Sequence, residues 1–415
     1  MTNSAAGHTL HHNGVFSKDG QWIVFDGRNE ETKIGETAAI GIINVKTREE
    51  KIIYRILHPT LYGPGVGAAS FSPVADRVIF IHGLAGAGKE KPYGFTRRTG
   101  VAVDINRPFQ PIYMDARDIT YPYTPGSLRG GTHSHCWSPD GKMISFTYND
   151  ELVNPDLRSV GVLFNSGKPV ITDTASGNNN GEMFAAIIAH IVKEPKPGSN
   201  EINKAFDECW VGTNGYVNNK GKRIPHALAF QGNTINKKGE TVTEIFVTDI
   251  DTTAILNDPA AVGTPGEWPR VPAGLTQRRV TSTVRGLSPV RHWLRSSTDG
   301  RYIYALASDD KNISQIIRCN INSGEITYLT QMPFPVDHPF NLNKDGSKVA
   351  FIANNNVYVL DMNSSKIVQL TFNQASGYKI TGAPLFSPDG KMLVFNQYQL
   401  VENKQYLQIM SININ

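Results

Sequence analysis

The chain has 415 residues, a formal charge of only +4 and 19% charged residues, which is below the roughly 25% of an average soluble domain. It contains no cluster of Lys and Arg, which argues against nucleic acid as the main partner, and no run of 18 apolar residues, so we expect no membrane span. The 38 glycines and 24 prolines favour a turn-rich structure over one of long helices.

The N-terminal residues 1–10 show neither the basic region nor the apolar region of a secretion leader. We therefore expect a cytoplasmic protein if Met1 is the native start, and a periplasmic one if a leader was removed. The three cysteines, Cys136, Cys209 and Cys319, lie far apart and match neither a disulfide framework nor a CxxC metal site. We expect them to be buried thiols.

One short pattern recurs along the chain: an apolar strand, a four-residue turn ending in Asp-Gly, and a second apolar strand. The turns lie at Ser17–Gly20, Ser138–Gly141, Ser297–Gly300, Asn343–Gly346 and Ser387–Gly390, with a degenerate copy at Ser72-Pro73. Pro presets the turn, Asp bonds its own backbone and Gly supplies a positive φ. Each copy therefore predicts a tight β-hairpin.

A third and a fourth apolar segment follow most of the hairpins. Four antiparallel strands in each unit, repeated about every 40–60 residues, are typical of propeller blades. We predict an all-β fold, a single β-propeller domain over residues 1–415. We count seven four-stranded blades, with six or eight as the alternatives. Their approximate ranges are 8–57, 58–120, 121–175, 178–283, 284–332, 333–373 and 374–415.

The fourth blade has lost the turn pattern. We place its inner strand at Met183–Val192 and its second strand at Ile224–Phe230, with an insertion at 193–223 between them. Within the insertion, Ser199 is expected to cap a short helix that runs through Glu208.

The repeat resembles the TolB-like, WD40-like propeller repeat, and three segments narrow the resemblance. These segments are Tyr121–His135, Phe146–Asp150 and Pro197–Ala205. Together they look like the uncharacterised YidR-type bacterial proteins over almost the whole chain. The resemblance implies a fold and a family but no reaction. The N-terminus of that family usually supplies a closing strand that ends in Leu-Thr. Met1–Leu10 departs from this pattern, which leaves the closure of the ring open.

Histidine recurs at one position of the repeat, five residues before the Ser or Asn that opens each turn. His12, His133, His292 and His338 occupy it, Gly67 and Gly382 replace it in two blades, and His135 and His11 lie beside it. The position begins each inner strand, and the inner strands line the channel of a propeller. We therefore expect these imidazoles to converge on the channel axis.

Converging neutral imidazoles suit a divalent metal such as Mn, Zn, Fe or Ni. We predict that the metal ligands are His12, His133, His135, His292 and His338. Asp337, Glu182 and Gln374 are candidate oxygen donors. A general base, a site for an acidic substrate, or polar side chains that only bind channel water are the alternatives.

Two arginines accompany the histidines in the sequence. Arg129 lies four residues before His133, and Arg291 directly precedes His292. Arginine presents a rigid fork to carboxylate or phosphate, so both are candidates for the channel rim and for binding an acidic ligand. We count them, with His135, as the candidate catalytic residues. A surface salt bridge is the alternative for each arginine.

This combination is similar to oligogalacturonate lyase, a propeller of the same repeat class with a metal held by histidines and a His-x-His pair. His133-Ser134-His135 matches that pair in kind. The resemblance implies that a metal neutralises a uronate carboxylate while a base removes the C5 proton, followed by β-elimination. The expected function is thus a metal-dependent enzyme on an acidic carbohydrate. The alternatives are a TolB-like scaffold that binds a protein or peptide and a small-molecule sensor.

Overall fold

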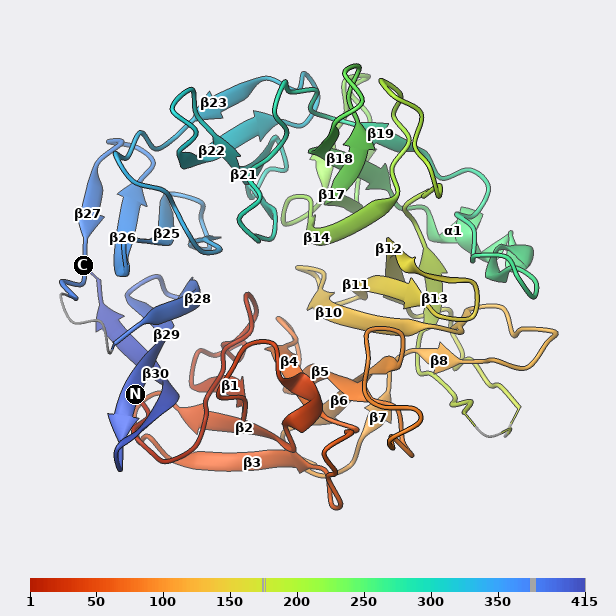
Figure 1. Ribbon diagram of the computed structural model, residues 1–415, viewed down its shortest axis with the longest axis horizontal. Coiled ribbons are helices and arrows are strands. Elements are labelled where there is room, and N and C mark those ends of the chain that lie inside the picture. The colour runs from red at the N-terminus through yellow and green to blue at the C-terminus, as the bar shows by residue number, and fades with distance from the viewer. Residues whose placement is uncertain (174, 176, 374–377, 415) are drawn as a thin grey trace.

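The computed structural model describes residues 1–173, 175, 177–373 and 378–414. Antiparallel sheets follow one another in chain order around a ring, with their first strands toward the centre (Figure 1). The all-β propeller predicted from the repeat is confirmed. The exact number of blades stays a prediction.

The sheets of the first part of the ring carry three or four strands each. The first contains β1 (Trp22–Asp26), β2 (Ala39–Asn44) and β3 (Glu50–Arg55), and the second contains β4 (Val66–Phe71), β5 (Arg77–Gly83), β6 (Arg98–Asp104) and β7 (Ile112–Tyr113). The parallel pair β8 (Ala116–Arg117) and β9 (Ser127–Leu128) precedes β10 (Gly131–Trp137), β11 (Met143–Asp150), β12 (Asn154–Phe164) and β13 (Phe184–Ile187).

The second part of the ring is built in the same way. It comprises β14 (Lys204–Trp210), the hairpin β15 (Tyr216–Val217) and β16 (Arg223–Ile224), β17 (Ala227–Ile235), β18 (Thr241–Asp249) and β19 (Gln277–Arg279). Next come β20 (Arg295–Ser296), β21 (Tyr302–Ser308), β22 (Ser314–Asn320), β23 (Ile326–Tyr328), β24 (Asn341–Leu342), β25 (Lys348–Ala353), β26 (Asn356–Asp361) and β27 (Ile367–Gln369). The last sheet contains β28 (Ile380–Phe386), β29 (Met392–Val401) and β30 (Lys404–Asn413).

Helix is confined, within the described residues, to α1 (Thr252–Leu256) and two 3-10 turns, η1 (Ile34–Glu36) and η2 (Pro259–Val262). Among the residues that the structure describes, no helix has the length and apolar character needed to cross a membrane.

The prediction for the fourth blade was wrong in its inner strand, whereas the second strand predicted at Ile224–Phe230 overlaps β17. Phe184–Ile187 pairs with β12 as an outer strand, so Met183–Val192 is not an inner strand, and Glu182 lies exposed beside Tyr113. The segment expected to be a helix forms β14, the strand that pairs with β17. Burial along this strand alternates up to Asp207, and the alternation is interrupted at Asp207 and Glu208, where the pairing with β17 shifts register.

The Asp-Gly turns form the predicted hairpins through one repeated set of hydrogen bonds. The Ser138 hydroxyl donates to Asp140 Oδ1 at 2.6 Å and accepts from the Met143 N–H at 2.9 Å. Gly141 has a φ of 68°, a left-handed conformation that glycine adopts without strain. The same serine–aspartate bond recurs at residues 17, 297 and 387.

The N-terminal segment closes the ring against the last sheet, where Figure 1 places the N-terminus beside β30. The N–H of Thr2 donates to Ile409 O at 3.1 Å, and the N–H of His8 donates to Leu407 O at 2.8 Å. The Gln408 side chain also donates to the carbonyls of Ser4 and Ala6. The two ends of the chain therefore pair to close the ring, although the N-terminal segment lacks the Leu-Thr ending that is usual in the family.

Apolar side chains of neighbouring sheets pack face to face around the ring. One cluster joins Ile23 and Phe80 of the first two sheets to Val394 of the last sheet. This continuous packing fixes the sheets relative to one another, so the residues that face the centre are held by a rigid frame.

Candidate functional site

A pocket of about 370 Å³ lies at the centre of the ring and is lined by residues from several sheets. This central pocket falls within the size range of small-molecule sites. Four arginines line it, Arg28, Arg98, Arg158 and Arg291, against two carboxylates, Glu31 and Asp207. Cationic groups are in excess, so the pocket is suited to an anionic ligand.

Bulges in the inner strands shape one part of the wall. Ala68 of β4, Ser134 of β10 and Asp207 of β14 have φ values of 55°, 58° and 50°, and each lies where the register of its strand shifts. All three line the central pocket. A bulge re-aims the side chains around it, so the same local irregularity turns residues of three neighbouring sheets toward the centre.

The four arginines differ in how they are neutralised. Arg28 is buried and forms a two-fold pair with Asp26, with Nε to Oδ1 at 2.7 Å and Nη2 to Oδ2 at 2.8 Å. Arg98 is 7% exposed and forms no ion pair within the described residues. Its guanidinium lies 4.6 Å from the centre of the Tyr93 ring and 4.5 Å from that of Phe95.

Within the described residues, Arg158 and Arg291 also form no ion pair shorter than 4.0 Å. Arg158 Nε donates to Asn149 Oδ1 at 3.3 Å, and Arg291 Nε lies 4.0 Å from Asp207 Oδ1. The Arg291 guanidinium stacks 4.4 Å from the centre of the Trp293 ring. Held by rings and amides, Arg98, Arg158 and Arg291 keep charge available for a ligand.

Two histidines and one cysteine cluster beside the pocket. His11, His12 and Cys136 are all buried, and one potential ligand atom of each lies within 4.8 Å of the others. The His12 ring stacks on Trp293 at 3.8 Å, and His12 Nε2 lies 3.6 Å from Cys136 Sγ. Nδ1 of His11 is buried without a hydrogen-bond partner. Among the described residues, these three side chains form the group that could hold a metal ion.

The chemistry of this group does not fit manganese. Manganese favours carboxylate, carbonyl and water oxygens, whereas a thiol with two imidazoles suits zinc or copper. Arg295 Nη2 lies 3.2 Å from His12 Nδ1 and donates to it, which places the ring proton on Nε2, the atom that faces Cys136. Burial raises the pKa of the Cys136 thiol, which opposes the thiolate that a metal needs.

His133 lies in the wall of the central pocket, but a neighbouring side chain holds its ring. Its Nε2 lies 3.1 Å from Asn149 Oδ1 and donates to it. Burial, then the charges of Arg98 and Arg158, holds the pKa of His133 well below its usual value. Burial likewise lowers the pKa of His11 and His12, so these imidazoles are neutral near pH 7.

The other three histidines do not converge on the pocket. His292 donates through Nδ1 to Val290 O at 2.6 Å and accepts the N–H of Leu306 at Nε2, so neither ring nitrogen is left for a metal. His338 pairs with Asp337 at 2.7 Å. His135 is fully buried with Nε2 3.1 Å from Thr132, because the bulge at Ser134 gives His133 and His135 different faces. Gln374 lies outside the described residues.

The two arginines predicted to lie at the channel rim have different positions. Arg291 lines the pocket, but Arg129 is 1% exposed and forms an ion pair with Asp150 at 3.3 Å. Arg129 also donates to the carbonyls of Thr264 and Glu267, at 3.0 and 2.5 Å. It therefore anchors the segment after α1 and is not among the residues that line the central pocket.

Asp207, Arg28, Arg98 and Arg158 are pocket residues that sequence reasoning missed. A signal for Asp207 was present, since Cys209-Trp210 repeats Cys136-Trp137 and aligns Asp207 with Ser134. Arg28, Arg98 and Arg158 lie outside the repeated turns, and no local motif distinguishes them.

Comparisons with known proteins agree with the fold. A family model described as "Protein of unknown function (DUF3748)" matches residues 65–178. "Uncharacterized protein YidR" of Escherichia coli (strain K12) is 33% identical over 410 residues, covering 95% of this chain and 94% of that protein. The resemblance to YidR-type proteins is thereby confirmed.

Two solved structures share the fold at low identity. Oligogalacturonate lyase in complex with manganese aligns with a TM-score of 0.56 and 12% identity, over 98% of this chain and 89% of that one. A puromycin hydrolase aligns with a TM-score of 0.56 and 9% identity over 99% of this chain, which spans 52% of the hydrolase. Identities this low carry the fold and nothing about the reaction.

Proposed function

This chain belongs to the YidR family, and from the chemistry of its own central pocket we propose that it binds an acidic saccharide there and cleaves it by β-elimination. The observation that carries the proposal is the set of arginines, of which Arg98, Arg158 and Arg291 lack close ion pairs within the described residues. A guanidinium fork matches a carboxylate, and Arg98, which is only 7% exposed, is costly to bury without a charge partner.

The choice of a uronate as substrate class has two supports. Trp293 and Phe95 give the pocket apolar walls beside the arginines, which suits a ligand that combines a carboxylate with a carbon ring. The shared fold with oligogalacturonate lyase makes galacturonate oligomers the first ligands to test.

Elimination requires that negative charge on the uronate carboxylate be stabilised as the neighbouring C–H bond breaks. Arginines that aromatic rings and amides already hold in place stabilise this charge in the transition state with little reorganisation. Arg98 and Arg158 are the best placed, because Phe95 stacks on both guanidinium groups, at 4.5 and 5.5 Å. No step in this scheme requires a metal.

Calorimetry with di- and trigalacturonate, and with the neutral galactose oligomers, tests the binding step. We expect acidic oligomers to bind and neutral ones not to bind. Arg98→Gln removes one charged hydrogen bond to the ligand, about 1.5–3 kcal/mol. The dissociation constant should then rise roughly ten- to 150-fold.

Arg97→Gln is the matched control for this experiment. Arg97 is the adjacent residue but lies outside the central pocket, 3.8 Å from Glu151. Its replacement should leave binding unchanged. Equal binding of acidic and neutral oligomers, or equal effects of the two variants, would refute the proposed site. Binding of uronates without cleavage would favour the small-molecule sensor.

A further inference from the structure

Asp207 is an unusual carboxylate of the central pocket. It lies on β14 where the pairing with β17 shifts register, and its φ of 50° places the backbone in the left-handed region. Aspartate adopts this conformation more readily than most residues, but it still has a cost there. The bulge turns Asp207 into the pocket wall, beside Arg158 and Arg291.

The carboxylate of Asp207 accepts no hydrogen bond from the described residues, although Asp207 is only 8% exposed. Its nearest cationic atom is Arg291 Nε, at 4.0 Å. Other buried aspartates are fully engaged: Asp26 accepts from Arg28 and the Ala68 N–H, and Asp115 accepts from Gly100 and Thr132. A buried carboxylate without donors that faces a pocket is free to take a proton from a ligand.

We propose that Asp207 is the general base of the elimination, which rests on the proposed function of the pocket. With the uronate carboxylate on the arginines, an Asp207 oxygen takes the proton from C5. The C–H electron pair first spreads onto the uronate carboxylate that the arginines hold, and it then forms the C4=C5 double bond as the C4–O bond breaks. The leaving oxygen takes a proton from water, and the hydroxide formed removes the proton from Asp207, so the cycle consumes no other reactant.

The basicity of Asp207 suits this role. Burial raises the pKa of Asp207 to about 6, although the charges of Arg291 and Arg158 oppose the rise. An aspartate with a pKa near 6 is still mostly ionised at pH 7 and is a stronger base than an exposed one. His133 is a poorer candidate, because its Nε2 is bonded to Asn149 and its pKa is held well below the usual value.

The test follows three readouts on trigalacturonate with wild type and Asp207→Asn. Calorimetry reports binding, NMR in deuterated water reports exchange of the C5 proton, and ultraviolet absorbance reports the conjugated double bond. We expect Asp207→Asn to bind at least as tightly, because a negative charge beside the ligand is removed. Exchange and elimination should fall by roughly 10²- to 10⁴-fold.

Glu208→Gln is the matched control. Glu208 is the next residue and is equally buried, but its oxygens accept from Ser145 and Thr147 and it does not line the central pocket. We expect this variant to keep exchange and elimination. The wild-type rate should fall as the pH drops below about 6, which gives a second readout that needs no variant.

The outcomes separate the two proposals. If Asp207→Asn retains exchange and elimination at the wild-type rate, the base assignment is wrong while the binding site and the elimination stand. If wild type binds uronates but neither exchanges the C5 proton nor eliminates, the base assignment and the proposed cleavage fail while the binding site stands. If no uronate binds to wild type, the proposed function and the base assignment fail together. A circular dichroism spectrum of Asp207→Asn that matches wild type excludes misfolding as the cause of a lost rate.

Discussion

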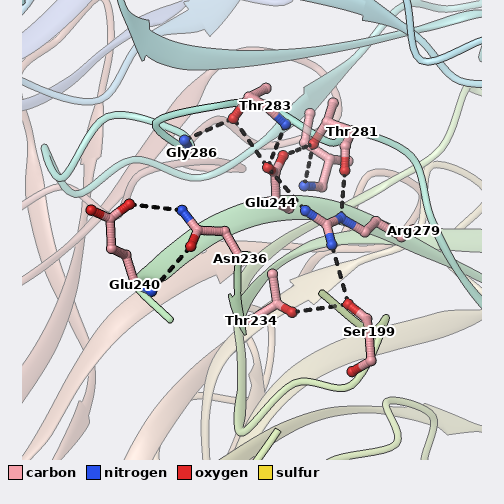
Figure 2. A network of polar contacts seen from close by, with 10 residues as sticks. Ser199, Thr234, Asn236, Glu240, Glu244, Arg279, Thr281, Thr283 and Gly286 are labelled. Atoms are coloured by element: carbon pink, nitrogen blue, oxygen red, sulfur yellow. Dashed lines mark hydrogen bonds and ion pairs between the residues drawn. The ribbon is translucent and has the colours of Figure 1, made fainter. Parts of the chain in front are cut away.

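A dense polar network centres on Glu244, a residue of β18 with no exposed surface. Figure 2 shows its carboxylate surrounded by donors. Arg279 Nη2 donates at 3.2 Å, and the Thr283 N–H and hydroxyl donate at 2.7 and 3.0 Å. The Thr281 hydroxyl donates to the other oxygen. The network ties the segment after β19 to the sheet that carries Asp207.

Glu244→Gln replaces one carboxylate oxygen by an amide of nearly equal size. The variant leaves Arg279, whose side chain is 11% exposed, without its charge partner. Breaking a buried ion pair in this way costs about 3–5 kcal/mol. Arg279 keeps its bonds to the carbonyls of Thr281 and Ser199, at 2.7 and 3.2 Å, so we expect the lower end, about 3 kcal/mol.

Urea unfolding followed by tryptophan fluorescence measures this loss as a lower midpoint. Glu240→Gln is the control from the same hairpin, because Glu240 is exposed and its side chain bonds Asn236 at 2.9 Å (Figure 2). Its replacement should change the free energy of unfolding by less than about 0.5 kcal/mol. A loss below about 1 kcal/mol for Glu244→Gln would refute the reasoning, because it would mean that the pair carries little stability.

Two further predictions concern acid and metal. Burial lowers the pKa of His292 to about 4, so the stability that neutral His292 contributes is present above pH 6.5 and is lost as the pH falls toward 4. The gap in unfolding free energy between wild type and His292→Gln should therefore narrow by about 3 kcal/mol from pH 7 to pH 4, and urea titrations showing a constant gap would contradict this. Arg295→Gln lets His12 carry its ring proton on Nδ1, which leaves Nε2, the atom that faces Cys136, available to a metal. Equilibrium dialysis of untagged protein should then show more bound zinc than wild type, and equal uptake would show that Arg295 does not block the site.

The hairpins were predictable because their determinants are local. Residues within one short segment make the hydrogen bonds of the turn, as Ser138, Asp140 and Gly141 do with the residues that directly follow them. The propeller follows from repeating that unit, since each blade buries its faces only against the next blade. The ring closure could not be predicted from the sequence, because it depends on hydrogen bonds from Thr2 and His8 to β30, which lies at the other end of the chain.

The site was harder to predict because it depends on where each strand departs from regularity. Counting back from the turn placed His292 and His338 in the inner strands, yet β20 and β24 are only two residues long and begin after them. A side chain that lies outside a paired strand does not alternate between the two faces of the sheet as strand residues do. At Ser134 the bulge changes the face of every residue that precedes it, so equal spacing from the turn does not mean equal direction.

The histidines and the arginines of the centre therefore have different roles. Burial lowers the pKa of His11, His12 and His133, so these rings fill the channel without adding charge. The positive potential of the pocket then comes from the guanidinium groups, which stay protonated at all working pH values. Acidification to pH 6 should strengthen uronate binding only through Asp207, because it is the group of the pocket whose pKa burial raises to about 6. A ligand affinity that rises in acid in wild type but not in Asp207→Asn is the signature of this arrangement, whereas a rise in both would assign the titration to the histidines.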